Sequence, residues 1–166
     1  LLVGNIFPLT IIPAGQTSAV FKVQAPDNRR IDGARLASVT ASVANWTGAT
    51  NTVLIFDDEN TALTAWIPIF LGEGIGVLTN AGEVRISGTL TTNLTVSMYG
   101  NLGFDLIPIG PVPIPAGQTN AHFSLYVGDN GVIDPVRLAE VTVTAPGFTD
   151  GVAGAFLFDN DGPPDP

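Results

Sequence analysis

The sequence predicts an all-β protein, an antiparallel β-sandwich of about 100 residues that is repeated in tandem. Three observations predict this fold class. One ten-residue segment occurs twice with few changes. Alternating strand-like stretches and turn signals follow one another at about ten-residue spacing. The 166-residue chain also contains 19 glycines and 13 prolines, the residues that favour turns. No segment shows a sustained helical period with capping residues.

The repeat is the clearest of these features. Residues 12–21 read IPAGQTSAVF, and residues 114–123 read IPAGQTNAHF. The alignment extends without a gap from residues 12–57 to residues 114–159, an offset of 102 (114 minus 12), and about 20 of the 46 pairs are identical. A fixed long period of this kind indicates a tandem array of structural units.

Each copy of the repeat opens with a turn that leads into a strand. In the Pro-Ala-Gly turn, proline presets φ at the second turn position and glycine at the fourth accepts a positive φ. The alternation that follows predicts a strand whose core-facing residues are Ala19, Phe21, Val23 and Ala25. In the second copy, the predicted core-facing residues are Ala121, Phe123, Leu125 and Val127. The predicted outward residues are His122, Ser124 and Tyr126. Further strands are predicted at residues 84–90, 94–100, 137–145 and 152–158.

The repeat divides the chain into two predicted domains. Residues 61–166 form a complete repeat with a short C-terminal tail, and residues 1–60 form the C-terminal half of another. The N-terminal strands of that first repeat are either missing, because the chain is a fragment of a longer protein, or supplied by another chain through strand addition. In both cases a half sandwich on its own would leave an apolar face in water.

Composition excludes several classes of function. With 15 acidic and 6 basic side chains, a net charge of -9, the chain repels nucleic acid and anionic membrane, so neither is an expected partner. The absence of cysteine excludes thiol chemistry and zinc–thiolate sites, and the single histidine, His122, cannot assemble a catalytic set. No run approaches the length of a membrane span, so we expect no membrane insertion. These features predict a protein that is not an enzyme.

Several motifs together resemble the Calx-beta domain family. They are IPAGQTSAVFKV, the pairs Asp27-Asn28 and Asp32-Gly33, VTASV, and VLIFDDEN, with FLGEGIGV in the second unit where the family has its opening motif. The first unit resembles the second half of such a domain, and the second unit resembles the whole. The resemblance implies an immunoglobulin-like sandwich in secreted or cell-surface proteins, where these domains occur in tandem as spacers and adhesive stalks.

The resemblance also implies calcium bound among the loops at one end of the sandwich. In the second unit the ligands would be Glu73, Asp129, Asp134, Asp159 and Asp161. In the first unit the matching residues are Asp27, Asp32, Asp57 and Asp58, with Glu59 adjacent. The chain departs from the family where Asn28, Asn130 and Asn160 replace carboxylates, which weakens calcium binding. Because Asp and Asn also favour turns, acidic loops that bind no ion remain the alternative.

These observations predict a non-enzymatic extracellular or cell-surface module with a structural or adhesive role, stiffened by Ca²⁺ at its loop ends. Its expected partners are neighbouring repeats or identical chains. The alternative is a subunit of a self-assembling extracellular filament, a homopolymer in which strands of a neighbouring chain complete the half-domain.

Overall fold

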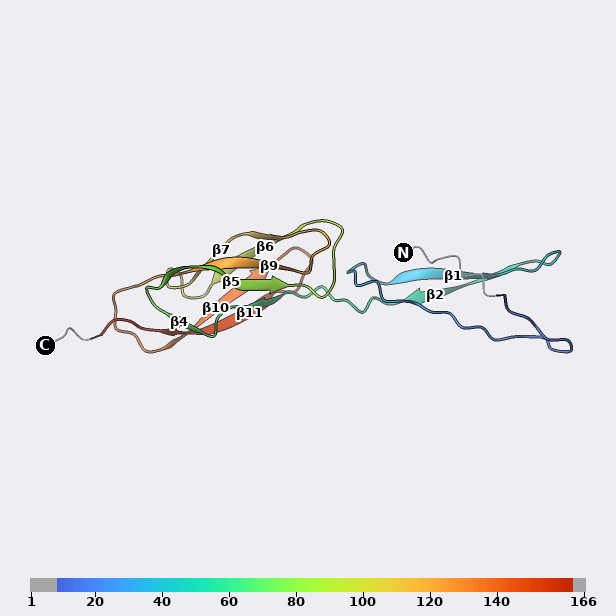
Figure 1. Cartoon of the computed structure of the whole chain (residues 1–166), viewed down its shortest axis with the longest axis horizontal. Coiled ribbons are helices and arrows are strands. Elements are labelled where there is room, and N and C mark those ends of the chain that lie inside the picture. The colour runs from blue at the N-terminus through green and yellow to red at the C-terminus, as the bar shows by residue number, and fades with distance from the viewer. Residues whose placement is uncertain (1–8, 163–166) are drawn as a thin grey trace. The chain divides into compact units, whose positions relative to one another are not determined.

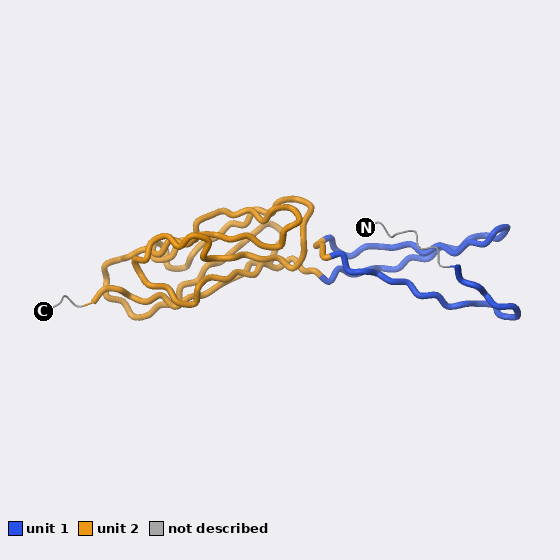
Figure 2. Tube along the Cα trace, in the orientation of Figure 1, with its two compact units in different colours: residues 1–28, 32–58 blue, residues 29–31, 59–166 orange. Residues whose placement is uncertain are grey.

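The computed structural model describes residues 9–162, all of which lie in strands, turns and extended segments (Figure 1). The first eight residues of the predicted half-repeat and the last four of the predicted tail lie outside the described residues. The chain divides into two compact units (Figure 2). Unit 1 comprises residues 1–28 and 32–58, and unit 2 comprises residues 29–31 and 59–166. No helix of the described chain is long and apolar enough to cross a membrane.

Unit 2 contains two sheets. The five-stranded sheet has, in spatial order, β4 (Phe70–Gly72), β11 (Gly151–Phe158), β10 (Arg137–Thr144), β6 (Leu94–Gly100) and β8 (Val112–Ile114). The four-stranded sheet has β3 (Thr64–Trp66), β5 (Gly76–Arg85), β9 (Asn120–Val127) and β7 (Ile107–Ile109). Both sheets contribute to one apolar core, so the predicted all-β sandwich is confirmed.

One pairing departs from the predicted antiparallel pattern. β4 runs parallel to β11, with Phe156 opposite Phe70. The segment that contains β3 and β4 pairs first with β5 in the four-stranded sheet and then with β11 in the other, so it changes sheets along its length. The five-stranded sheet is therefore mixed rather than purely antiparallel.

The core of unit 2 follows from strand alternation. Along β11 buried and exposed residues alternate without interruption, as a strand with one face on the core requires. The buried apolar residues are Leu63, Ile67, Leu71, Val84, Ile86, Val96, Leu106, Ile114, Phe123, Leu125, Val127, Ala139, Val141, Val143, Ala145, Ala153, Ala155 and Leu157. The predicted strands over residues 94–100, 137–145 and 152–158 are confirmed as β6, β10 and β11, apart from single residues at the ends.

The predicted strand over residues 84–90 is wrong beyond Arg85, where β5 ends. Most of β5 lies earlier in the chain and contains an irregularity between Leu78 and Gly82, with Asn80 at a φ of 52°. Asn and Gly are poor strand formers, so propensity alone did not indicate a strand there. Beyond Arg85 the chain bends at Ser87 and Gly88, and the apolar residues Ile86 and Leu90 lie in no strand.

The repeated turn has the predicted glycine but a different position for it. The N–H of Gln16 donates to the carbonyl of Pro13 at 2.9 Å, and the N–H of Gln118 donates to that of Pro115 at 3.0 Å. Proline is therefore the first turn residue and glycine the third. Gly15 and Gly117 have φ values of 82° and 78°, the left-handed conformation that a type II turn requires at its third position.

Among the described residues, unit 1 contains one hairpin, β1 (Arg35–Ala41) with β2 (Ala49–Ile55). The predicted strand over residues 19–25 is absent: the segment pairs with no strand, and Phe21 and Val23 are exposed. The counterpart segment in unit 2 is β9, which pairs with β5 and β7 and buries Phe123 and Leu125. Unit 1 has no described strands in the places of β5 and β7, so residues 19–25 have no neighbouring strand with which to pair.

Candidate metal centre

Glu73 sits where three strands of unit 2 end. It follows β4, and its backbone N–H donates to the carbonyl of Phe158 at 2.8 Å. The next N–H, of Gly74, donates to the carbonyl of Gly128 at 2.8 Å. These bonds tie the residue to the ends of β11 and β9. The side chain is held inside, and the residue is only 4% exposed.

The two carboxylate oxygens of Glu73 have different surroundings. Oε1 accepts hydrogen bonds from the backbone N–H of Asn130 at 3.3 Å and from Arg137 at 3.2 Å. Oε2 is buried and accepts no hydrogen bond from any described residue. Burial raises the pKa of Glu73, because a buried carboxylate loses its hydration. The site therefore contains a carboxylate oxygen that is neither solvated nor paired.

Asp159 and Asp161 place their carboxylates beside that of Glu73. Glu73, Asp159 and Asp161 each offer one carboxylate oxygen within 4.8 Å of the other two. The chain folds back on Asp159, whose Oδ1 accepts from the N–H of Asp161 at 3.1 Å and whose Oδ2 accepts from the N–H of Asp134 at 3.0 Å. Oδ2 of Asp161 is also buried without a hydrogen-bond partner among the described residues.

The two aspartates differ in pKa. Burial acts to raise the pKa of Asp159, but the hydrogen bonds from the N–H groups of Asp161 and Asp134, followed by the neighbouring Glu73 carboxyl group and the positive charge of Arg137, outweigh it and the pKa is lowered. The pKa of Asp161 is raised, first by burial and then by the negative charges of Asp129, Asp159 and Asp134. Asp159 thus has its charge stabilised by the protein, whereas Asp161 and Glu73 have theirs disfavoured.

Asp129 and Asp134 lie on the adjoining loop but outside the group of three. Asp129 Oδ1 accepts from the N–H of Gly131 at 2.9 Å, which is a turn interaction. Asp134 Oδ2 accepts from the side-chain amide of Asn130 at 3.1 Å. Both therefore have local structural partners, and the negative charge of each still raises the pKa of Asp161. The role of all five acidic residues as ligands stays a prediction.

Arg137 is the residue of this centre that the sequence did not single out. It donates to Asp105 Oδ2 at 2.6 Å and to Glu73 Oε1 at 3.2 Å, and lies 3.4 Å from Asp134 Oδ2. Burial acts to lower its pKa, yet the three carboxylates raise it, so the guanidinium stays charged. A signal existed in the sequence: an arginine stands three residues after the aspartate in both repeats, at Arg35 and Arg137.

The acidic loops of unit 1 form the same hydrogen bonds. The N–H of Asp32 donates to Asp57 Oδ2 at 3.0 Å, matching the bond between Asp134 and Asp159. The amide of Asn28 donates to Asp32 Oδ2 at 3.0 Å, and Arg35 donates to Asp32 Oδ1 at 2.6 Å. The duplication therefore extends to individual bonds, and these loops have a defined conformation that recurs.

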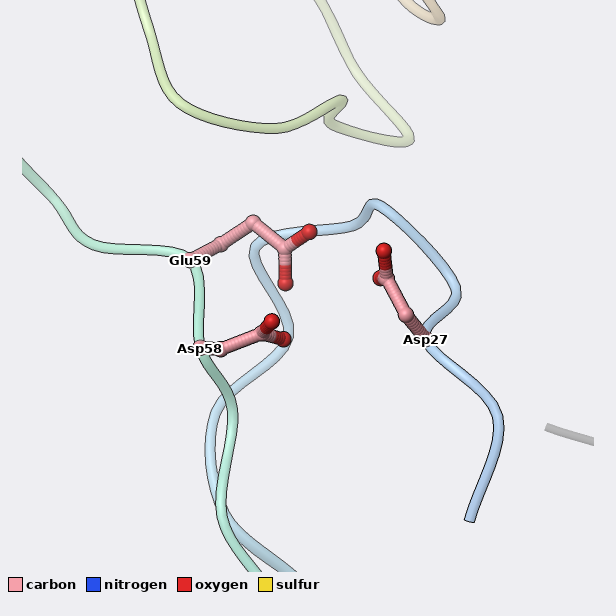
Figure 3. Close-up of side chains that lie close together, drawn as sticks. All are labelled: Asp27, Asp58 and Glu59. Carbon is pink, nitrogen blue, oxygen red and sulfur yellow. The ribbon is translucent and has the colours of Figure 1, made fainter.

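Asp27 and Asp58 also come together within unit 1. Their carboxylate oxygens lie within 4.8 Å of one another, and Figure 3 shows the two side chains directed toward the space between their loops. Glu59, also labelled in Figure 3, follows Asp58 in the chain and begins the long segment of unit 2. Asp32 and Asp57 line the same pocket of unit 1 as this pair and accept hydrogen bonds from backbone and side-chain donors.

The centre in unit 2 suits a hard cation. It offers oxygen atoms only, at least two of which are buried and without hydrogen bonds from the described residues. Ca²⁺ binds six to eight oxygens, carboxylates among them, and tolerates irregular geometry. The residues therefore fit a calcium ion, and Arg137 supplies part of the positive charge that holds the cluster together when no ion is bound.

Comparisons with known proteins gave matches among solved structures alone. No family model and no curated protein matches the chain. CBD12 from CALX1.2 is similar at a TM-score of 0.43 and 17% identity, over 60% of this chain and 44% of that one. The apo-form Calx CBD1 domain is similar at a TM-score of 0.41 and 16% identity, over 60% of this chain and 99% of that one. The chain thus spans less than half the length of the first. The fold itself rests on the strand pairing described above.

Proposed function

We propose that this chain is a non-enzymatic extracellular module with a structural or adhesive role, and that Ca²⁺ stiffens its sandwich at the acidic loop end. The ligands are the buried carboxylate of Glu73 together with Asp159 and Asp161, and the loop residues Asp129 and Asp134 complete the set. Its partners are neighbouring repeats or identical chains. The all-β sandwich, the duplicated loops and the acidic composition support this proposal.

One observation carries the proposal: Glu73 Oε2 is buried without a hydrogen bond from the described residues, and the Glu73 carboxylate lies close to two further carboxylates. A turn residue has no need of this arrangement, because a turn carboxylate accepts from nearby backbone N–H groups in the way that Asp129 does. A buried carboxylate without a partner costs free energy. Ligation of a cation removes that cost.

Calcium binding to the folded state alone raises stability by mass action. At a calcium concentration one hundred times the dissociation constant, the gain is about 2.7 kcal/mol. For a domain of about 100 residues this corresponds to a rise in melting temperature of roughly 10 °C. Three ends of strands meet at the site, so the ion would connect the tips of β4, β9 and β11 and stiffen that end of the sandwich.

The test compares the melting temperature in calcium and in chelator for the parent chain, Glu73→Gln and Glu83→Gln. Glu83 is the matched control, because it is a partly buried glutamate of the same unit that already has two side-chain partners. We expect calcium to raise the melting temperature of the parent and of Glu83→Gln, and to leave Glu73→Gln nearly unchanged. The same calcium-induced rise in all three proteins would contradict the metal centre.

In chelator, Glu73→Gln should raise the melting temperature above that of the parent. Because burial raises the folded-state pKa of Glu73, the folded state retains its proton above the ordinary pKa, and stability falls as pH rises through that window. Glutamine carries no charge, and its amide oxygen can still accept from Arg137. We therefore expect Glu73→Gln to melt a few degrees higher than the parent in chelator at neutral pH. A lower melting temperature would show that the pair with Arg137 outweighs the cost of burial.

A second candidate function is the filament subunit completed by strands of an identical chain. Its support is that Phe21 and Val53 of unit 1 are exposed, whereas their counterparts Phe123 and Ala155 belong to the core of unit 2. Strands equivalent to β5 and β7 would cover such a face. Sedimentation of the full chain tests this candidate: assembly that Phe21→Ser and Val53→Ser abolish supports it, and a monomer at all concentrations contradicts it.

A further inference from the structure

The outer face of the four-stranded sheet in unit 2 carries one aromatic ring among polar side chains. These residues, which we call the outer grid, are Thr64, Trp66, Glu83, Arg85, Asn120 and His122. They alternate along their strands with Ala65, Val84 and Ala121, which are buried in the core or packed against it, so they point away from the core. The ladders arrange the outer grid in two rows across β3, β5 and β9, one containing Trp66 and the other Arg85.

Hydrogen bonds fix the polar groups at the middle of the outer grid. Glu83 Oε2 accepts from Arg85 at 2.7 Å, and Glu83 Oε1 accepts from the side-chain amide of Asn120 at 2.6 Å. The hydrogen bond from Arg85, followed by that from Asn120, lowers the pKa of Glu83 to about 2, so at neutral pH this carboxylate is an ionised acceptor. These groups therefore have defined positions before any ligand binds.

An open pocket of about 450 Å³ lies over the part of the outer grid that includes the edge strand β3. Thr64, Ala65 and Trp66 of β3 and Glu83 and Arg85 of β5 line it. The volume is within the range of small-ligand sites, about 300–1,000 Å³. Such sites combine an aromatic or apolar wall with a few fixed polar groups. The lining of this pocket has that composition, because the Trp66 side chain stands beside the hydrogen-bonded pair of Glu83 and Arg85.

The charges of the pocket favour an uncharged ligand. Glu83 and Arg85 form an ion pair, so the wall as a whole has no net charge. An anionic ligand would meet the carboxylate of Glu83 and a chain with a net charge of -9, whereas a cationic ligand would meet the guanidinium of Arg85. The wall is nevertheless rich in hydrogen-bonding groups. Arginine has more N–H donors than the bond to Glu83 uses, each carboxylate oxygen has a second lone pair, and Thr64 contributes a hydroxyl group.

We propose that this pocket binds an uncharged saccharide, with one face of a sugar ring stacked on Trp66 and its hydroxyl groups bonded to Glu83, Arg85 and Thr64. A sugar ring has an apolar face of C–H groups and a rim of hydroxyl groups. It therefore needs an aromatic surface beside fixed donors and acceptors, which is what the outer grid offers. The inference goes beyond the proposed function, because none of these residues belongs to the metal centre.

Trp46 provides an internal comparison for Trp66. The chain has two tryptophans, and both are exposed, Trp46 by 80% and Trp66 by 56%. Exposure of a single apolar residue needs no explanation in itself. Trp46 lies in a turn of unit 1, where its N–H donates to the carbonyl of Val43 at 3.1 Å, and it is not part of the pocket. The two residues therefore separate the effect of an exposed indole ring from the effect of the pocket.

The test is isothermal titration calorimetry of the full chain in chelator, so that the calcium centre has no influence. The probes are neutral oligosaccharides of glucose, galactose, mannose, xylose and N-acetylglucosamine, with oligogalacturonate as the anionic comparison. We expect at least one neutral oligosaccharide to bind the parent. Trp66→Ala should weaken that binding by about tenfold or more, as loss of a central aromatic contact does. Arg85→Gln should weaken it severalfold, and Trp46→Ala should leave it unchanged.

Trp66→Tyr is the second variant of the pocket, because it keeps an aromatic surface and should retain part of the binding that Trp66→Ala loses. Melting temperatures confirm that each variant is folded. Absence of binding by every neutral probe would overturn the proposal, and so would Trp66→Ala that binds as tightly as the parent. Tighter binding of oligogalacturonate than of any neutral probe would also overturn it and would assign the pocket to the guanidinium of Arg85. None of these results changes the calcium-dependent melting, so the metal centre is judged separately.

Discussion

Glu83 shows how two neighbours determine the charge state of a carboxylate near the surface. It accepts hydrogen bonds from Arg85 at 2.7 Å and from Asn120 at 2.6 Å. The hydrogen bond from Arg85, followed by that from Asn120, lowers its pKa from 4.5 to about 2. A folded-state pKa below the unfolded value stabilises the protein above the unfolded pKa, and this stabilisation is lost as pH falls through the folded pKa.

We therefore expect Glu83→Gln to lower the melting temperature by a few degrees at neutral pH and to approach the parent as pH falls toward about 2. Scanning calorimetry over this range measures the difference between the two proteins. Glu140→Gln, on a strand of the other sheet, serves as the control. A difference between Glu83→Gln and the parent that stays constant with pH would contradict an ionic origin for the stabilisation.

The candidate site could be predicted in part from single residues. The resemblance named Glu73, Asp159 and Asp161, and the structure brings these three together although 86 residues (159 minus 73) separate the first two. The resemblance could not show that Glu73 is buried, because burial depends on where β4 joins β11. It also missed Arg137 and its bond to Asp105, since an arginine in a strand reads as an ordinary surface residue.

At the scale of elements, pairing partners decided which alternating segments became strands. Residues 19–25 and β9 share their alternation, yet only β9 forms a ladder, because β5 and β7 lie on either side of it. Strand propensity describes how well a residue fits a half-buried sheet, so it fails where no sheet is present. The sequence predicted β6, β10 and β11 well because each alternates cleanly, and it missed β5 because glycines and asparagine interrupt the pattern.

Gly82 in β5 makes this dependence on packing testable. A Cβ at this position would lie 2.3 Å from ring atoms of Phe123, which is directly opposite in β9 and buried in the core. The ring cannot move away without disturbing that core, so we expect Gly82→Ala to lower the free energy of unfolding by about 1–3 kcal/mol. Chemical denaturation of the two proteins measures the difference.

Gly154→Ala is the matched control for Gly82→Ala. Gly154 lies on the exposed side of β11, and the nearest atom to an added Cβ is Leu138 Cδ1 at 3.5 Å, an ordinary contact. We expect its free energy of unfolding to stay within about 0.5 kcal/mol of the parent. Equal losses from the two substitutions would mean that glycine matters in these strands for reasons other than the packing of Phe123.

At the scale of the whole molecule, the two units share a sequence pattern but differ in what that pattern encloses. The acidic loops keep their hydrogen bonds in both, as Asp32 with Asp57 and Asp134 with Asp159 show. The core does not persist in the same way, because Phe21 is exposed and Phe123 is buried. The loop conformation is therefore retained because each unit keeps the hairpin whose two ends these residues flank, whereas burial requires further strands from elsewhere.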